Sequence, residues 1–360
     1  MKKRLFTVLL VFVMGLPASA QQDRLTVVAT HSILADVVQN VAGDAADVTS
    51  LLPLNADPHS YTPTPRELVM LAEVDVVFVN GAFFEEGLLE GIENAATDIT
   101  IVEASRCVEI LPFGHHDHEE EERKHEGEDH EEHADGPCEA HHEEAHIAHH
   151  DASLGVLIDL DCGEGHEHEE EEEHEEGEEH GHEEGSCDAH VWMNPENVML
   201  WTLTIRDALS ELDPANAETY AQNTAAYIVQ LSELQSELES LVQAVPEENR
   251  VLVTSHDSLG YFAARFEFEV VGVVIPGGST VSEPSAQDLA ELIDEIEEEG
   301  VSAVFAETTV APGLVQQVAA ESGASVLTLY SGSLSDADGP ASTYLDYMRY
   351  NVETIVNGLG

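Results

Sequence analysis

The sequence predicts an α/β protein of two (βα)4-like lobes with mainly parallel sheets, joined by a long rigid helix. Three observations predict this architecture. Short β-branched runs alternate with helical patterns, the second half of the chain repeats the rhythm of the first, and one long helical pattern separates the halves. Alternating strands and helices favour parallel sheets that are covered by helices on both faces.

The first half contains four predicted strands and the helices that follow them. Runs rich in Val, Leu, Ile and Thr predict the strands, and apolar residues at helical spacing predict the helices. The strands are expected over 25–30, 47–52, 75–80 and 99–104, and the helices over 33–43, 65–74, 84–96 and 195–212.

A single apolar stripe predicts the linking helix. Its members recur at alternating spacings of four and three residues, which places them on one helix face: Tyr227, Leu231, Leu234, Leu238, Leu241 and Val245. The helical pattern runs from Ala215 to Val245, and about 30 residues at 1.5 Å each give a rod of about 45 Å. A rod of this length can run past two lobes, and Pro246 ends it.

The second half repeats the pattern. The strands are expected over 250–255, 268–275, 302–307 and 325–330, and the helices over 257–266, 285–300, 312–323 and 343–359. We therefore expect an N-terminal lobe over 24–212, a linking helix over 213–246 and a C-terminal lobe over 247–360.

A histidine- and glutamate-rich insert, 113–187, interrupts the N-terminal lobe. It holds 16 of the 20 histidines beside 30 acidic residues, with only Arg123 and Lys124 as basic ones. Such a tract cannot bury enough apolar surface to fold, so we expect disorder. A solvated acidic tract would need glutamate alone. The repeated imidazoles instead indicate the handling of a divalent metal ion.

The first 20 residues have the pattern of a signal peptide. Three basic residues precede an apolar stretch from Leu5 to Leu16, and Ala18-Ser19-Ala20 forms a small-residue cleavage site. A transmembrane anchor is the competing interpretation, but the apolar run is short for one. We expect a periplasmic or otherwise extracytoplasmic protein, and no lipoprotein-type cysteine follows the signal to decide between periplasm and cell surface.

The net charge bears on the class of partner, and the cysteines bear on the disulfide pairing. The net charge of −61, with only 12 Lys and Arg residues, argues against a nucleic-acid partner. The four cysteines allow three pairings, and we expect the nested one, Cys107–Cys187 with Cys138–Cys162. Thiolate ligation of a metal is the alternative.

Four histidines lie outside the insert: His31, His59, His190 and His256. Each alone would more often be a capping or packing residue. Together, at strand ends in an exported protein with a histidine-rich tract, they favour a shared metal site, because ligands of open α/β folds gather at the carboxyl ends of strands. We leave His31 out of the predicted ligand set.

Four ordered motifs carry a family resemblance: DPHSYTPTP at 57–65, AHVWMNP at 189–195, TSHDSLGYF at 254–262 and TYLDYMRYN at 343–351. The chain resembles the solute-binding proteins of zinc and manganese ABC importers (cluster A-I). The histidine-rich loop resembles that of the zinc-importing branch. The resemblance implies a metal site in the inter-lobe cleft with His59, His190 and His256 as ligands. It also implies delivery of the ion to a membrane permease.

The predicted ligands favour Zn(II) over Mn(II). Manganese-directed relatives tend to carry a carboxylate where this chain has His256, and neutral imidazoles suit zinc whereas manganese prefers oxygen. Many relatives also place an aspartate ligand where this chain has Gly332. The fourth ligand therefore stays open among water, Asp336, Asp338 and Glu307.

We expect a monomeric zinc receptor and no enzyme. A zinc hydrolase is one rival, but the two lobes outside the insert contain no HExxH helix and only Glu307 offers a general base. A metal-buffering or adhesion protein, in which the insert does the work, is the other rival.

Overall fold

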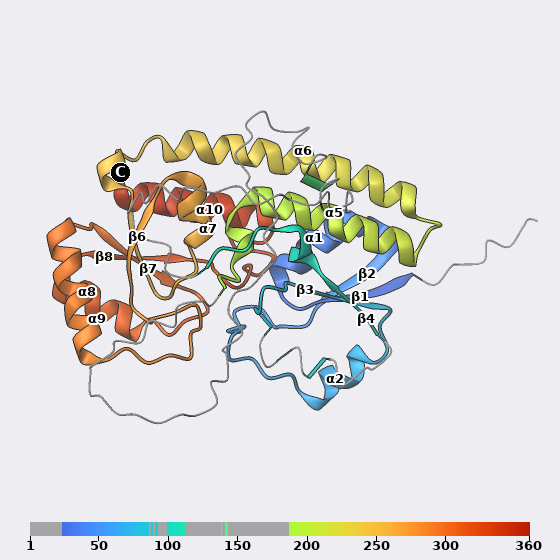
Figure 1. Ribbon diagram of the computed structural model, residues 1–360, viewed down its shortest axis with the longest axis horizontal. Coiled ribbons are helices and arrows are strands. Elements are labelled where there is room, and N and C mark those ends of the chain that lie inside the picture. Colours follow the sequence, from blue (N-terminus) through green and yellow to red (C-terminus); the bar gives the residue numbers. More distant parts are fainter. Residues whose placement is uncertain are drawn as a thin grey trace, which may run out of the picture.

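The computed structural model describes residues 24–85, 88, 91–92, 99–112, 138, 141–142 and 187–360. The predicted signal peptide and most of the insert lie outside the described residues. Two lobes, each built on a four-stranded parallel sheet, lie side by side (Figure 1). The predicted fold class is confirmed.

The N-terminal sheet has the strand order β2-β1-β3-β4. Its strands are β1 (Leu25–Ala29), β2 (Ala46–Ser50), β3 (Val76–Val79) and β4 (Thr100–Glu103), and its helices include α1 (Ser32–Ala42) and α2 (Pro65–Leu71). Strand β3 is buried along its whole length, as expected for a strand in the interior of a parallel sheet. Thr64 and Glu67 form a capping box that begins α2, with Pro65 at its first position.

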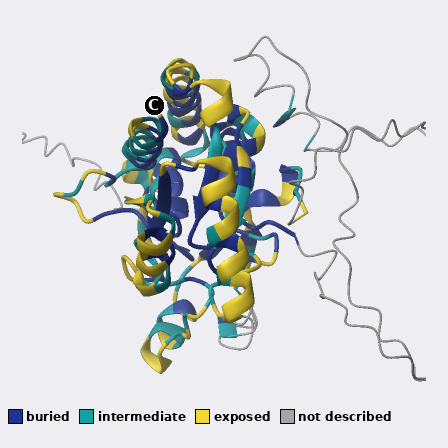
Figure 2. Cartoon of the chain, turned by 90° about the vertical axis from the view of Figure 1, so that its left-hand side faces the viewer, coloured by how far each residue is buried: buried dark blue, intermediate teal, exposed yellow. Residues whose placement is uncertain are grey.

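The C-terminal sheet repeats this order as β6-β5-β7-β8. Its strands are β5 (Val251–Thr254), β6 (Glu269–Val273), β7 (Ala303–Glu307) and β8 (Ser325–Leu329), and its helices are α7 (Gly260–Phe266), α8 (Ala286–Glu299) and α9 (Gly313–Ser322). Figure 2 shows the buried strands at the centre and the exposed outward faces of the helices.

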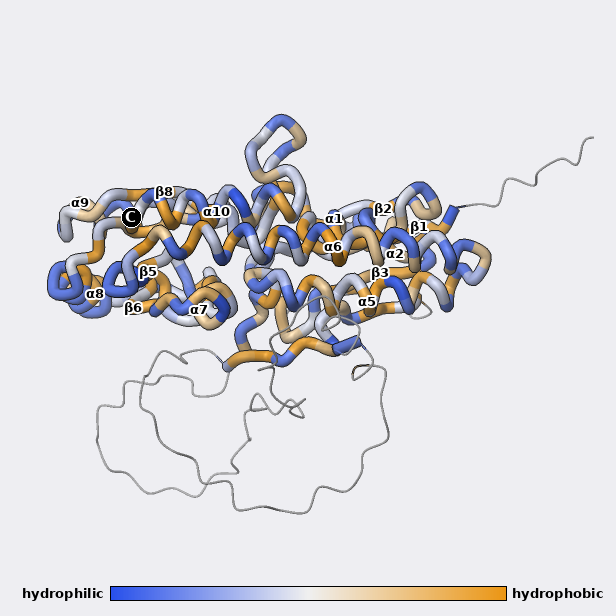
Figure 3. Tube along the Cα trace, turned by 90° about the horizontal axis from the view of Figure 1, so that it is seen from above, coloured by the Kyte–Doolittle hydropathy of each residue, from blue (hydrophilic) through white to orange (hydrophobic). Residues whose placement is uncertain are grey.

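Three long helices tie the lobes together: α5 (Pro195–Leu212), α6 (Ala217–Val242) and α10 (Tyr344–Leu359). Helix α6 runs alongside both lobes and packs against α1, α5 and α10 (Figures 1 and 3). The predicted stripe is buried except at Leu241, which is partly buried, and Leu231, Leu234 and Leu238 are fully enclosed. The largest hydrophobic cluster includes Val27 of β1 and Phe305 of β7, so the two lobes share one core.

All eight strands lie within two residues of their predicted limits. The helices differ more. Helix α6 ends at Val242 instead of reaching Val245, and α7 begins at Gly260 because residues 256–259 form a turn beside the candidate site. Most of the helix predicted over 84–96 lies outside the described residues. No helix in the described ranges is both long enough and apolar enough to cross a membrane.

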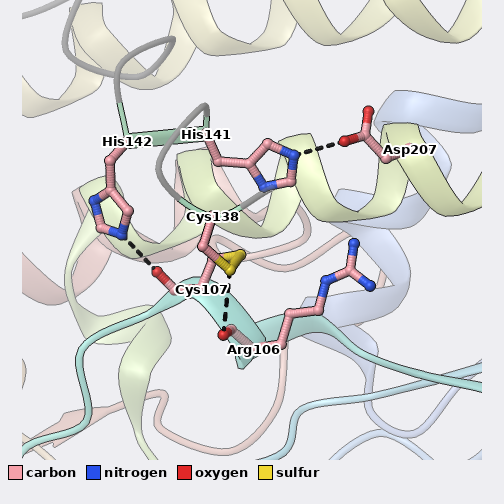
Figure 4. Close-up of a disulfide and its surroundings, with 6 residues drawn as sticks. All are labelled: Arg106, Cys107, Cys138, His141, His142 and Asp207. Atoms are coloured by element: carbon pink, nitrogen blue, oxygen red, sulfur yellow. Dashed lines mark hydrogen bonds and ion pairs between the residues drawn. A yellow bond between two sulfur atoms is a disulfide. The ribbon is translucent and has the colours of Figure 1, made fainter. Parts of the chain in front are cut away.

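The predicted nested pairing of the cysteines is wrong. Cys107 is bonded to Cys138, with 5.1 Å between their Cα atoms. Cys138 belongs to a helical turn of the insert that packs against the body of the protein (Figure 4). The Nε2 atom of His141 lies 2.6 Å from Asp207 Oδ2 on α5, and the Nε2 atom of His142 lies 2.9 Å from the carbonyl oxygen of Cys107. These contacts bring Cys138 to Cys107, and a low-complexity tract gave no sign of such an anchored turn.

Candidate metal centre

The structure brings His59, His190 and His256 together between the lobes. His59 lies in the long loop between β2 and α2, His190 directly precedes a short 3-10 turn that leads into α5, and His256 follows β5. The Nε2 atom of His190 lies 3.4 Å from Nε2 of His59 and 3.2 Å from Nε2 of His256. Among the described residues, these three form the one group of histidine, cysteine or carboxylate side chains placed to hold a metal ion.

Two of the three separations between the nitrogens fit a tetrahedral ion. Two nitrogens that each lie about 2.0–2.1 Å from a zinc ion at the tetrahedral angle are about 3.3 Å apart. The two separations lie on either side of this value. Without a metal, each contact can be an N–H···N hydrogen bond when one of its two nitrogens carries a proton. The same convergence of ring nitrogens is what a shared cation requires.

Carboxylates hold two of the three rings, those of His190 and His256, at the Nδ1 atom on the side away from the metal centre. His190 Nδ1 lies 2.9 Å from Asp188 Oδ1, which also accepts from the backbone N–H of His190. His256 Nδ1 lies 2.9 Å from Glu307 Oε1, which accepts from the backbone N–H of His256 at 3.1 Å. Each carboxylate places the proton on Nδ1 and points Nε2 at the centre. Such pairing orients histidine ligands and raises their basicity.

His59 is held differently. Its Nδ1 is buried but has no hydrogen-bond partner. Only its backbone N–H is fixed, by donation to Asp57 Oδ1 at 3.1 Å. The ring itself lies edge-on against Phe84, with 5.5 Å between the centroids. The position of this imidazole therefore depends on the loop that carries it.

An aromatic wall closes the inner side of the site. Phe84 and Trp192 are buried and their ring centroids lie 5.0 Å apart. Phe84 contacts His59 and His190, and Trp192 contacts His190. The Trp192 indole N–H donates to the carbonyl oxygen of Ser331, which comes from the other lobe. The wall therefore packs against the rings of His59 and His190.

Two of the three imidazoles, those of His59 and His190, are neutral at ordinary pH. Burial, together with the charge of its histidine neighbours, lowers the pKa of His59 and that of His190 to about 3. Burial also acts to lower the pKa of His256, but the charge and hydrogen bond of Glu307 outweigh it and raise that pKa above its ordinary value. Since a metal binds only the neutral ring, His256 is the ligand that must release a proton first.

The structure narrows the choice of fourth ligand. Glu307 is occupied behind His256, and its Oε2 accepts from the Ser258 hydroxyl at 3.3 Å. Asp336 and Asp338 are exposed. Neither these aspartates nor Glu307 belongs to the group of converging ligand atoms in the described part of the chain.

Sequence reasoning missed the supporting residues Asp57 and Asp188. It considered Glu307 as a ligand, as a base or as an acceptor for backbone donors, and the last of these roles is present, because Glu307 accepts from the backbone N–H of His256. A signal for the two aspartates was present. Asp57-Pro58-His59 and Asp188-Ala189-His190 both read Asp-x-His. In both, the aspartate accepts from the backbone N–H of the histidine two residues later. Phe84 gave no comparable signal, because its contacts are to residues distant in the sequence.

Comparison with known proteins shows the family of the chain. A family model described as the periplasmic zinc-uptake complex component A matches residues 27–358. The chain belongs to this family.

The names of relatives of this chain mention different metals. The manganese-binding lipoprotein MntA of Halalkalibacterium halodurans is 28% identical over 342 residues, covering 95% of this chain and 90% of that protein. The metal ABC transporter substrate-binding lipoprotein ScbA of Streptococcus cristatus is 27% identical and covers 100% of this chain and 99% of its own. The iron-binding protein YfeA of Yersinia pestis is 28% identical, covering 93% and 86%.

Solved structures show the same architecture. A manganese-bound mutant of the periplasmic metal-binding protein from candidatus Liberibacter asiaticus matches with a TM-score of 0.68 and 26% identity, covering 94% of this chain and all of that one. A crystal structure of ZnuA matches with the same TM-score at 24% identity, which shows the fold alone.

Proposed function

We propose that this protein captures Zn(II) outside the cytoplasm and delivers it to the membrane permease of an ABC importer. The observation that carries the proposal is the convergence of three imidazole Nε2 atoms between the lobes, with no carboxylate among the described ligand atoms. Relatives named as substrate-binding lipoproteins of metal ABC transporters support the transport role. They also support an extracytoplasmic location. The proposal takes the chain to act as a monomer beside its permease.

The choice of zinc rests on ligand chemistry. Three neutral nitrogens at tetrahedral spacing suit Zn(II), whereas Mn(II) favours more ligands and prefers oxygen. The names of the relatives include manganese and iron, so a mixed-divalent or manganese receptor is the competing proposal. Competition between the two ions distinguishes them.

A transport role also agrees with the position of Glu307, the one general base that a hydrolase could use here. Glu307 is held by His256 and Ser258, so it is not free to accept a proton from a metal-bound water. Two of the three ligands, His190 and His256, are buried, and His59 is partly buried. Capture of an ion is compatible with this burial, whereas hydrolysis needs room for a substrate beside the metal.

For the insert we propose the role of an auxiliary metal antenna. Its histidines and carboxylates would hold several ions weakly and raise their local concentration near the cleft. In that role the insert adds binding capacity and does not contribute to the tight site.

The test is calorimetric titration of the mature chain with Zn(II), in the presence and absence of Mn(II). We expect one tight zinc site that manganese does not occupy, plus several weak ones. His190→Ala should abolish the tight site, whereas the matched control His142→Ala, in the turn docked on the body, should retain it. Equal competition by manganese would favour the mixed-divalent receptor.

A second titration uses a variant without residues 114–185. It also carries Cys107→Ser and Cys187→Ser, since the deletion removes the other two cysteines and free thiols bind zinc. The antenna role predicts loss of the weak sites and survival of the tight one. Disappearance of the tight site would instead make the insert the functional part of the molecule.

A further inference from the structure

The opposite lobe holds the loop that carries His59. Thr280, in the loop between β6 and α8, donates its hydroxyl hydrogen to Asp57 Oδ2 at 2.6 Å. The other oxygen of the same carboxylate, Oδ1, accepts from the backbone N–H of His59. One carboxylate therefore links a C-terminal-lobe hydroxyl to an N-terminal-lobe metal ligand.

A second C-terminal-lobe segment contacts the same loop from the turn after β8. The backbone N–H of Asn55 donates to Ser333 Oγ at 3.0 Å. Gly332 lies so close to Pro58 that an added Cβ would be 3.0 Å from the Pro58 ring. The His59 loop thus lies between two loops of the C-terminal lobe. Of the two, the loop of Thr280 is the one that donates a hydrogen bond to the carboxylate of Asp57.

The three ligands differ in what keeps them in place. His190 and His256 have carboxylate partners on Nδ1 within their own lobes, so their rings stay oriented whatever the other lobe does. His59 has no partner on its buried Nδ1. If the lobes separate at the Asp57–Thr280 contact, His59 is the ligand that loses its support.

We infer that Thr280 is a positioning residue of the metal site, which sets how long the bound ion stays by holding the His59 loop through Asp57. The inference rests on the proposed function and adds a route for release. The ion leaves when the inter-lobe contact opens and His59 withdraws, while His190 and His256 stay in place. A permease that separates Thr280 from Asp57 would trigger release without disturbing the other two ligands.

The test measures the rate of metal dissociation from the full mature chain loaded with one equivalent of Zn(II). A strong chelator is added in excess, and the slow kinetic phase reports the tight site because ions on the insert leave quickly. Thr280→Val keeps the shape of the side chain and removes the donor. We expect dissociation to become about tenfold faster, as loss of a hydrogen bond to a charged group implies. Thr280→Ser restores the donor and should return the rate to near the wild-type value.

Ser60→Ala is the matched control, because Ser60 donates to the same Asp57 oxygen at 2.9 Å from within the His59 loop. It should leave dissociation nearly unchanged, since it breaks no contact between the lobes. Thermal unfolding of the metal-free variants shows whether the fold is retained.

The outcomes separate the two proposals. A wild-type chain with no slow phase would contradict the proposed function itself. A clear slow phase that is the same in wild type and Thr280→Val would overturn the inference about Thr280 alone. Faster release in Thr280→Val that Thr280→Ser does not restore would also overturn it, because the hydroxyl would then not be the cause.

Discussion

His31 is a fully buried histidine whose two ring nitrogens have no hydrogen-bond partner. It follows β1 and packs against Phe84 and Trp192, each with ring centroids 5.1 Å away. It lies outside the group of three converging histidines, behind the aromatic wall. Burial, aided by the charge of His190, lowers the pKa of His31 to about 3. Such a residue makes the stability of the metal-free protein depend on pH.

The sign of this dependence follows from the lowered pKa. As the pH falls from about 6.5 toward 3, the unfolded chain binds a proton at residue 31 that the folded chain refuses. The free energy of unfolding therefore falls by about 1.4 kcal/mol per pH unit from this one group. His31→Phe keeps an aromatic ring and removes the titration.

We expect the difference in unfolding free energy between pH 7.5 and pH 4.5 to be about 2–3 kcal/mol smaller in His31→Phe than in the wild type. Urea denaturation of both metal-free proteins at the two pH values measures it. Comparing differences removes any constant cost of the larger ring. Equal pH dependence in the two proteins would mean that the buried His31 ring titrates normally.

At the scale of a structural element, the turn after β3 positions Phe84, which forms part of the aromatic wall of the metal site. Gly81, Ala82 and Phe83 all have positive φ angles, of 85°, 52° and 62°, and two of them carry side chains that disfavour this region. Buried Glu85 holds the turn. It accepts from the Thr30 hydroxyl at 2.7 Å and from the backbone N–H groups of Asn80 and Gly81.

Removing this carboxylate should loosen the turn. Glu85→Ala leaves three donors without their acceptor, two of them buried and one partly buried, so we expect the free energy of unfolding to fall by about 3 kcal/mol. Phe84 follows the turn directly and contacts both His59 and His190. We therefore expect zinc affinity to weaken as well, by about tenfold, in calorimetric titration. The control is Phe83→Ala in the same turn, whose side chain is 72% exposed and should affect neither quantity.

The helices and strands could be predicted because their signals are local. The apolar stripe from Tyr227 to Leu238 and the β-branched runs are each readable within a few residues, and strand limits were right to within two residues. The convergence of His59, His190 and His256 followed from the positions of His59 and His256 after strands and, for all three, from family motifs.

Contacts between distant residues could not be predicted. Asp57 and Thr280 are 223 positions apart, and nothing in either neighbourhood marks a shared hydrogen bond. Fixing of the Glu85 turn depends on Thr30, which is 55 positions away. Such contacts arise from the assembled sheets, and it is these contacts that position the site.

At the scale of the whole molecule, a shared core and three long helices join the lobes, and one docked turn ties the insert to them. The core cluster draws on both sheets, so relative movement of the lobes is restricted to the loops around the site. Of the insert, the structure describes Cys138, His141, His142 and Cys187. His141 is 2% exposed and its partner Asp207 belongs to α5, so the docked turn is part of the folded body.

The Cys107–Cys138 bond carries the last prediction. It closes a segment of 31 residues, and cross-linking such a segment stabilises a protein by about 3–4 kcal/mol by restricting the unfolded chain. We expect Cys107→Ser with Cys138→Ser to lower the free energy of unfolding by about this amount, measured by urea denaturation with tryptophan fluorescence. Tight zinc binding should survive, because neither cysteine contacts the three histidines.

Asp207→Asn is the control. It weakens the contact to His141 but keeps the covalent link, so it should cost about 1 kcal/mol. A non-reducing peptide map gives an independent check. Recovery of Cys107 joined to Cys187 would contradict the docked turn, and the double variant would then report on a different loop.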